Sequence, residues 1–170
     1  RVDLQLVALV PLPYWLSPEG KAFARQVADW GGLLGGVLGP PYGGSALAEQ
    51  EALAALLALA EQLGCGVDLH VDESDRQPGR GVALVARLAL EQRSRVPITC
   101  SHSCSMALLG ERALDRLADQ MAAAGLGVVA LPLTNQWLLG RRHGQTPVQR
   151  AQAPIRCLQR AGVKVAVGAD

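Results

Sequence analysis

The sequence has no long apolar segment of the kind that a membrane protein needs. Its longest apolar run, residues 4–16, is interrupted by Gln5 and by the turn-forming residues Pro11 and Pro13, whereas a membrane-spanning helix takes about 20 consecutive apolar residues. No basic segment and no cleavage site precede this run, so it lacks the pattern of a signal peptide. We therefore expect no membrane partner.

Excess charge of either sign is also missing, and cysteines are few. With 16 basic and 15 acidic residues the formal net charge is +1, so the sequence shows none of the basic excess that nucleic acids or acidic membranes attract. Four cysteines in 170 residues are too few for a disulfide framework and favour a reducing compartment, the cytoplasm.

Both ends of the chain lack the polar linkers that usually mark domain boundaries. Arg1 lies within an apolar strand pattern, and Asp170 directly follows another. We therefore expect residues 1–170 to be part of a longer barrel domain, with further sequence on both sides.

The pattern along the chain predicts strands alternating strictly with helices. Ser17 and Ser45 are typical N-cap residues, and Gly64 is a typical helix stop. Pro154 lies within the last predicted helix, where it should cause a kink. The strands are expected at residues 2–10, 33–38, 65–71, 96–101, 126–133 and 163–168, and the helices at 18–30, 46–63, 82–92, 111–124 and 147–161.

Such alternation indicates parallel strands joined by right-handed crossovers. No G-x-G-x-x-G motif follows the first strand, which removes the main support for a dinucleotide-binding fold. A doubly wound sheet and a (β/α)8 barrel both fit the pattern.

A strand ending in His70 leads into an acidic stretch that contains Glu73. The two residues are three apart, so in a continuous strand they would face opposite sides; to share a site, the chain must leave the strand just after His70. An imidazole can bind a divalent metal, and a nearby carboxylate can transfer protons to and from its water. This stretch alone fits a histidine at the edge of the core, followed by a solvated acidic loop, equally well.

The positions of two further residues favour the site. His70 ends the third predicted strand, His102 the fourth, and Asp170 the sixth. In a barrel the carboxyl ends of all strands open on one face, where active sites are built. His143 lies in a loop and is expected to be solvated, without a role.

Cys100, His102 and Cys104 alternate along the chain, which suggests a Cys-His-Cys metal site as one alternative. Structural zinc usually takes four ligands with closely spaced cysteine pairs. Small buried cysteines beside a functional His102 are the preferred interpretation.

Several motifs together resemble the cytosine deaminase branch of the amidohydrolase superfamily. They are His-Val-Asp-Glu at 70–73, Ser-His-Ser at 101–103, Leu-Pro-Leu-Thr-Asn at 131–135, Leu-Gly-Arg at 139–141 and Gly-Ala-Asp at 168–170. The resemblance runs in order over nearly the whole chain. It implies a (β/α)8 TIM barrel, present here as a fragment covering about strands 3 to 8, and a hydrolase that deaminates a small cytosine-like heterocycle or related cyclic amidine.

The resemblance also implies a role for each site residue. His70 would bind one divalent metal ion, zinc or iron, whose bound hydroxide attacks the ring. Glu73 would shuttle the proton, and His102 would either bind the metal or hold the hydroxide. Asp170 would bind the metal and take the proton from its water.

Three departures from the family pattern limit this expectation. The family's His-x-His pair is absent and must lie upstream of Arg1, so we expect this piece alone to be inactive. Pro11 stands where family members place an amide that grips the pyrimidine, and Ala169 stands where cytosine deaminases commonly have histidine. The last two changes weaken cytosine as the particular substrate and leave metal-assisted hydrolysis intact.

Substrate contacts are expected from aromatic and amide side chains in the loops. Trp15, Tyr14 and Trp137 would form a stacking wall or simply pack their loops, and Asn135 would hydrogen-bond the substrate or cap its loop. Two other functions stay open: a non-catalytic ligand-binding α/β module, and an amidohydrolase that cleaves a different cyclic amide or N-alkyl amine. The sequence leaves the oligomeric state open, a homo-oligomer included.

Overall fold

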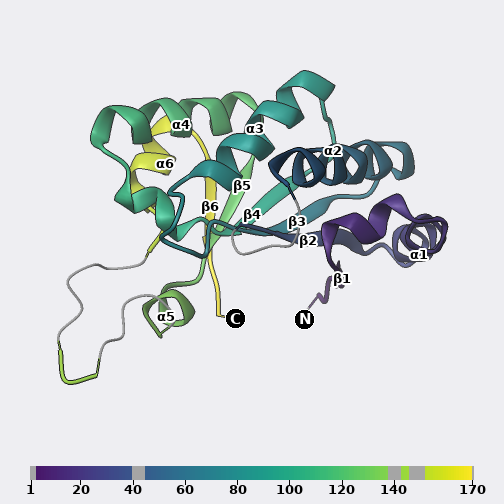
Figure 1. The fold of residues 1–170 in the computed structure, drawn as a ribbon, viewed down its shortest axis with the longest axis horizontal. Helices are drawn as coiled ribbons and strands as arrows, with labels where there is room; N and C mark the ends of the chain where they lie inside the picture. The colour runs from purple at the N-terminus through teal and green to yellow at the C-terminus, as the bar shows by residue number, and fades with distance from the viewer. Residues whose placement is uncertain (1–2, 40–44, 138–142, 146–151, 170) are drawn as a thin grey trace.

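The computed structural model describes residues 3–39, 45–137, 143–145 and 152–169, and its strands form a single parallel sheet (Figure 1). Each strand pairs with the next one in the sequence, without a change in order. The strands are β1 (Val7–Leu9), β2 (Leu33–Leu38), β3 (Val67–Val71), β4 (Ile98–His102), β5 (Gly127–Ala130) and β6 (Lys164–Val167).

The main helices pack side by side in chain order and cover one face of this sheet (Figure 1). They are α1 (Pro18–Asp29), α2 (Ala46–Leu63), α3 (Arg80–Gln92), α4 (Glu111–Ala123) and α6 (Ile155–Ala161). A doubly wound sheet carries helices on both faces, whereas a barrel carries them only outside. The expected fold class, part of a (β/α)8 barrel, is confirmed.

Local capping explains where the first two helices begin. The Ser17 hydroxyl accepts a hydrogen bond from Gly20 N at 2.9 Å, and the Ser45 hydroxyl accepts one from Ala48 N at 3.2 Å. Gly64 ends α2 at φ 65°, a left-handed conformation that glycine adopts without strain. These three sequence predictions are confirmed.

Other predicted boundaries were wrong. The final helix begins at Ile155 and Pro154 precedes it, so the proline kinks nothing; residues 146–151 lie outside the described part. The strand expected at 126–133 ends at Ala130, because Pro132 starts the short helix α5 (Pro132–Asn135). Two 3-10 helices were not predicted, η1 (Leu12–Leu16) and η2 (Cys104–Leu108).

The two faces of the sheet differ in chemistry. Leu69 and Val71 are fully buried in the core beneath the helices. Asp68 and His70 alternate with them and therefore face the opposite side, the barrel interior. The register places His70 level with Ser101, so polar groups from neighbouring strands meet on that interior face.

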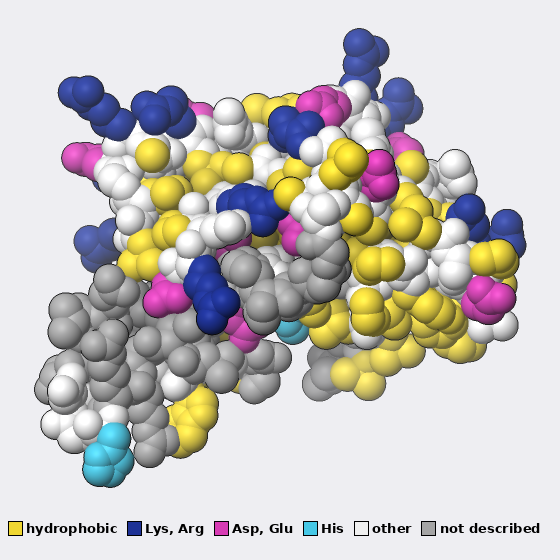
Figure 2. Space-filling view, in the orientation of Figure 1, with side chains coloured by type: hydrophobic (Ala, Val, Ile, Leu, Met, Phe, Trp, Pro, Cys, Tyr) yellow, Lys and Arg dark blue, Asp and Glu magenta, His cyan; other side chains and the backbone are white. Residues whose placement is uncertain are grey.

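Strand β1 forms an apolar edge of the sheet. Leu6, Val7 and Leu9 are exposed at 65%, 39% and 45%, and Figure 2 shows apolar side chains gathered near this edge. An exposed apolar edge strand normally pairs with, or is covered by, another element. Within the described residues, no helix is both long and apolar enough to span a bilayer.

Gly20 provides a test of how η1 packs on α1. A Cβ atom at this position would clash with the Tyr14 carbonyl oxygen. We expect Gly20→Ala to lower the free energy of unfolding by about 1–3 kcal/mol, although alanine favours a helix by about 1 kcal/mol. Urea unfolding of the protein measures this change.

Gly110→Ala is the control, because a Cβ atom there meets nothing within 4 Å and φ is −65°. This helix-start substitution should cost less than about 1 kcal/mol. An equal loss of stability in the two variants would contradict the packing explanation.

Candidate active site

Three consecutive strands each deliver a polar side chain to one place at their carboxyl ends. His70 comes from β3, His102 ends β4, and Asn135 lies in α5, directly after β5. His102 Nε2 lies 3.1 Å from His70 Nδ1, and His102 Nδ1 lies 2.9 Å from Asn135 Nδ2. The three side chains therefore form a continuous hydrogen-bonded row, with His102 at its centre.

A change in backbone conformation brings His102 into this row. In a regular strand His102 would share the helix-facing side with Cys100, which is fully buried in the core. Instead the chain adopts φ 67° at His102 and φ 49° at Ser103, a left-handed conformation uncommon outside glycine. The imidazole is 0% exposed and reaches His70.

The Cys-His-Cys alternative does not form a metal site. Among the described residues, Cys100, His102 and Cys104 are not arranged as a group that could hold a metal ion. Burial raises the pKa of the Cys100 thiol far above its ordinary value and that of Cys104 to about 12. Cys104 Sγ instead contacts the Asp72 carbonyl oxygen at 3.4 Å. The preferred interpretation, buried cysteines beside His102, agrees with this packing.

Glu73 joins the same site because the chain leaves strand β3 just after His70. A site shared by His70 and Glu73 requires this exit. Strand β3 ends at Val71, and Asp72 has φ 54°. Glu73 Oε2 then lies 3.9 Å from His102 Nε2, with 27% of the side chain exposed. His70 and Glu73 thus share a site despite their odd spacing.

Asp72 has a structural role that the sequence analysis missed. Its carboxylate is 3% exposed and accepts hydrogen bonds from Gly81 N at 2.8 Å and Val82 N at 3.0 Å, in the first turn of α3. Burial raises its pKa to about 6, while the two N–H groups act in the opposite direction. No local pattern revealed this role, because nine residues separate the acid from Gly81.

The backbone around Asp72 also joins the loops that follow β3 and β4. The Asp72 carbonyl accepts from Ser105 N at 3.1 Å, and the Val71 carbonyl accepts from Ser103 N at 2.9 Å. The Ser105 hydroxyl accepts from Gly79 N at 3.2 Å. These bonds fix the loop that carries Glu73 against the strand end that carries His102.

The remaining predicted residues are Trp15, Trp137, Asp170 and His143. Trp15 is 1% exposed, donates its indole N–H to the Gly35 carbonyl at 2.9 Å, and stacks on Phe23 at 4° between ring planes, so it packs its loop and offers no wall to a substrate. Trp137 is 64% exposed. Asp170 lies outside the described residues, and His143 is exposed as expected.

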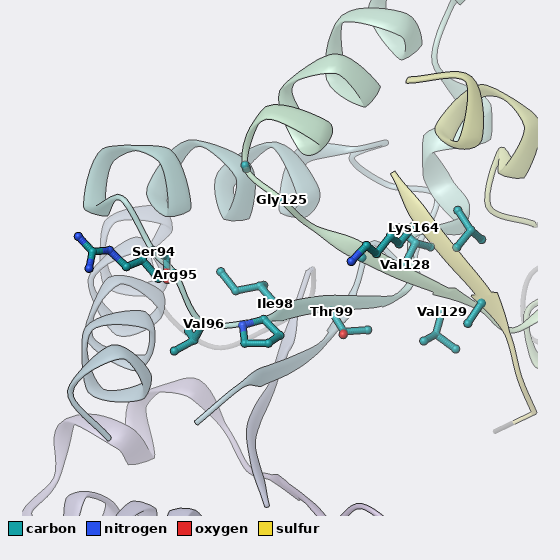
Figure 3. Close-up of a pocket in the computed structure, with 14 residues that line it drawn as sticks. Ser94, Arg95, Val96, Ile98, Thr99, Gly125, Val128, Val129 and Lys164 are labelled. Atoms are coloured by element: carbon teal, nitrogen blue, oxygen red, sulfur yellow. The ribbon is translucent and has the colours of Figure 1, made fainter. Parts of the chain in front are cut away.

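A hollow of about 480 Å³ lies at the opposite end of the sheet (Figure 3). The amino-terminal parts of β4, β5 and β6 line it, with Ser94, Arg95 and Lys164 among its polar residues. No predicted site residue lines it. Barrel enzymes carry their active sites at the carboxyl ends of the strands, so we assign the hollow no catalytic role.

The donor atoms fit part of a metal site. Two nitrogen ligands about 2.0–2.1 Å from one tetrahedral ion lie roughly 3.3 Å apart, close to the 3.1 Å between His102 Nε2 and His70 Nδ1. Among the described residues, no group of three or more histidine, cysteine or acidic side chains is arranged to hold a metal ion. The described residues therefore supply an incomplete set of ligands.

The chain matches a known family over most of its length. A model described as the amidohydrolase family matches residues 23–170. Pterin deaminase from Rhizobium rhizogenes is 33% identical over 173 residues, covering 100% of this chain and 38% of that protein.

Comparison with solved structures agrees with this family match. The 5-methylcytosine deaminase from Klebsiella pneumoniae, liganded with phosphonocytosine, superposes with a TM-score of 0.80 at 26% identity, covering 99% of this chain and 41% of that one. N-isopropylammelide isopropylaminohydrolase from Burkholderia multivorans gives 0.68 at 25% identity, covering 98% and 39%. The chain thus spans about 40% of the length of the relatives it matches.

Asp72→Asn tests whether the Asp72 carboxylate holds the loop. An amide keeps one acceptor oxygen and places an NH₂ group against a backbone N–H of α3. We expect a loss of about 1–3 kcal/mol in unfolding free energy, the cost of an unsatisfied buried group. Asp75→Asn, the same change at an exposed position of the same loop, should be neutral; equal stabilities for the two variants in urea unfolding would rule out the proposed capping.

Proposed function

The chain belongs to the amidohydrolase family, and on this basis we propose that the whole protein is a metal-dependent hydrolytic deaminase acting on a C–N bond of a small nitrogen heterocycle. One observation carries the proposal: His70, His102 and Glu73 converge at the carboxyl ends of β3 and β4. Residues 1–170 would form part of one barrel domain, completed by sequence on both sides. The missing metal ligands would come from the preceding part.

We propose that His70 and Asp170 hold a divalent ion, zinc or iron, at this barrel mouth. When bound, such an ion lowers the pKa of its water from 15.7 to about 7 and polarises the group under attack. Imidazole and carboxylate ligands suit either metal. The role of Asp170 rests on the Gly-Ala-Asp pattern at 168–170.

In this proposal, Glu73 carries out the proton transfers. Its carboxylate is partly exposed and lies 3.9 Å from His102 Nε2, so it faces the mouth where substrate and water would meet. It would take one proton from the attacking water and deliver it to the ring nitrogen. The second proton of that water would then pass to the amino group, which leaves as ammonia while the ring carbon becomes a carbonyl. General acid–base catalysis of this kind is worth about 10²–10⁴-fold in rate.

The relatives suggest the class of substrate. They are named for a pterin, for 5-methylcytosine and for N-isopropylammelide, and these compounds share an amine on a nitrogen-containing ring. Pro11 and Ala169 disfavour cytosine itself, so an aminated pyrimidine or pterin ring is the substrate class that we favour. Trp137, with its exposed indole, would offer a stacking surface.

Cysteine chemistry supports a location in the cytoplasm. Cys65, Cys100, Cys104 and Cys157 are all free and buried. Proteins of oxidising compartments commonly pair their cysteines, and a fold that keeps four thiols apart suits a reducing environment.

Glu73→Gln tests the proton-transfer role in the full-length protein. We expect kcat/KM for ammonia release from pterin, cytosine and 5-methylcytosine substrates to fall about 10²–10⁴-fold, with the metal content unchanged. Glu91→Gln is the control, because Glu91 pairs only with Arg87 on the surface of α3 among the bonds described. Unchanged turnover in Glu73→Gln would eliminate this role.

His70→Ala tests metal binding. We expect loss of both bound metal and turnover, because one imidazole ligand disappears, and a chelator should likewise inactivate the wild type until zinc or iron is restored. Metal analysis of the purified proteins measures occupancy directly. His143→Ala, which removes an exposed loop histidine, should keep its metal; full occupancy in His70→Ala would refute the ligand assignment.

A further inference from the structure

Asn135 occupies an unusual position for a loop residue. Its side chain is 0% exposed, and its Nδ2 lies 2.9 Å from His102 Nδ1. Its Oδ1 is buried and has no hydrogen-bond partner among the described residues. Buried polar groups are nearly always satisfied, and leucine would fill a similar space without an unpaired oxygen. Packing alone therefore does not explain an amide here.

The contact with His102 fixes where the imidazole carries its proton. A neutral imidazole has one N–H donor and one acceptor nitrogen. An amide N–H facing Nδ1 makes Nδ1 the acceptor, which leaves the proton on Nε2. Which ring nitrogen is free to donate is commonly set by the partner of the other nitrogen.

The opposite side of the His102 ring agrees with this direction. Nε2 faces His70 Nδ1 at 3.1 Å and Glu73 Oε2 at 3.9 Å. In the metal-free protein, Nδ1 of a His70 that is protonated on Nε2 accepts from this N–H. A carboxylate oxygen is also an acceptor, so Glu73 can face the same N–H when a metal ion takes the lone pair of His70. Without the metal, the row runs from donor to acceptor throughout, from the Asn135 amide through His102 to His70.

We propose that Asn135 is a positioning residue that holds His102 in the tautomer with hydrogen on Nε2. His102 then presents an N–H donor at the barrel mouth, able to orient water or substrate. In this tautomer the 3.1 Å contact between His102 Nε2 and His70 Nδ1 is a hydrogen bond and not the spacing of two ligands on one metal ion. A carboxylate in place of the amide would reverse this arrangement, accepting from Nδ1–H and freeing Nε2. The catalytic consequence rests on the proposed function, whereas the tautomer itself does not.

The test is a spectroscopic reading of the tautomer. Full-length protein labelled with ¹⁵N-histidine, with the metal removed, is examined by long-range ¹H–¹⁵N correlation, and the His102 signals are assigned by their disappearance in His102→Gln. We expect an unprotonated Nδ1 and a protonated Nε2. A wild-type spectrum with the proton on Nδ1 overturns the proposal.

Two variants sharpen the test. Asn135→Asp should move the proton to Nδ1, and Asn135→Leu should give a mixture of tautomers; both should lower kcat about tenfold or more while KM changes less. The control is Gln136→Glu, the same amide-to-acid change at the exposed neighbouring position, which should leave the His102 signals unchanged. A His102 tautomer that is the same in wild type, Asn135→Asp and Asn135→Leu also overturns the proposal.

The His102 tautomer and the deaminase activity are measured independently, so the role of Asn135 and the proposed function can fail separately. The predicted tautomer in a protein that deaminates nothing would contradict the enzyme assignment and support the role of Asn135. An active deaminase with the opposite tautomer would support the enzyme assignment and contradict the role of Asn135. If Asn135→Asp fails to fold, the wild-type and Asn135→Leu spectra still decide the question.

Discussion

The arrangement at the barrel mouth depends on one buried carboxylate. Asp72 accepts two N–H groups at the start of α3, while its own backbone carbonyl receives Ser105 N from the loop after β4. A single residue thus connects the end of one strand, the start of the following helix and the loop of the next strand. Its burial raises the pKa to about 6, so the carboxylate is mainly ionised at neutral pH and keeps its full capacity as an acceptor.

Near Asp72, successive side chains of the barrel strands alternate between the apolar core under the helices and the polar barrel interior. On β3, Leu69 and Val71 pack under the helices, whereas Asp68 and His70 face the interior. The Ser101 hydroxyl donates to Asp68 at 2.9 Å on the same interior face, so the polar groups below His70 are also paired. The row from His70 to Asn135 thus extends a hydrogen-bonded interior rather than interrupting an apolar core.

Much of this organisation could be predicted from the sequence, because it depends on local signals. Capping by Ser17 and Ser45 follows from residue type and position, and the alternation of elements follows from hydrophobic periodicity. The convergence of His70 and His102 followed from their shared place at strand ends. Asp170, by contrast, stays a prediction, because it lies outside the described residues.

What could not be predicted depends on contacts distant in sequence or on unusual backbone angles. Asp72 caps a helix that begins eight residues later, at Arg80, and no periodic pattern contains that contact. The 3-10 helix over Leu12–Leu16 was not predicted. It packs Trp15 on Phe23, which is the loop-packing alternative and not the stacking wall. The turn of His102 toward His70 needs a positive φ, which strand alternation excludes.

Positive φ angles lower the stability of the fold at residues whose side chains the site uses. Of the four non-glycine residues with positive φ in the described part of the chain, three lie at the end of β4 or directly after β3 and β4: His102, Asp72 and Ser103. Holding such a residue in this region costs on the order of 1–3 kcal/mol, and glycine would relieve that cost at each position. At Asp72 and His102, glycine would relieve the backbone strain but would also delete a buried, hydrogen-bonded side chain on which the site depends, so the strain is retained together with the chemistry of the site.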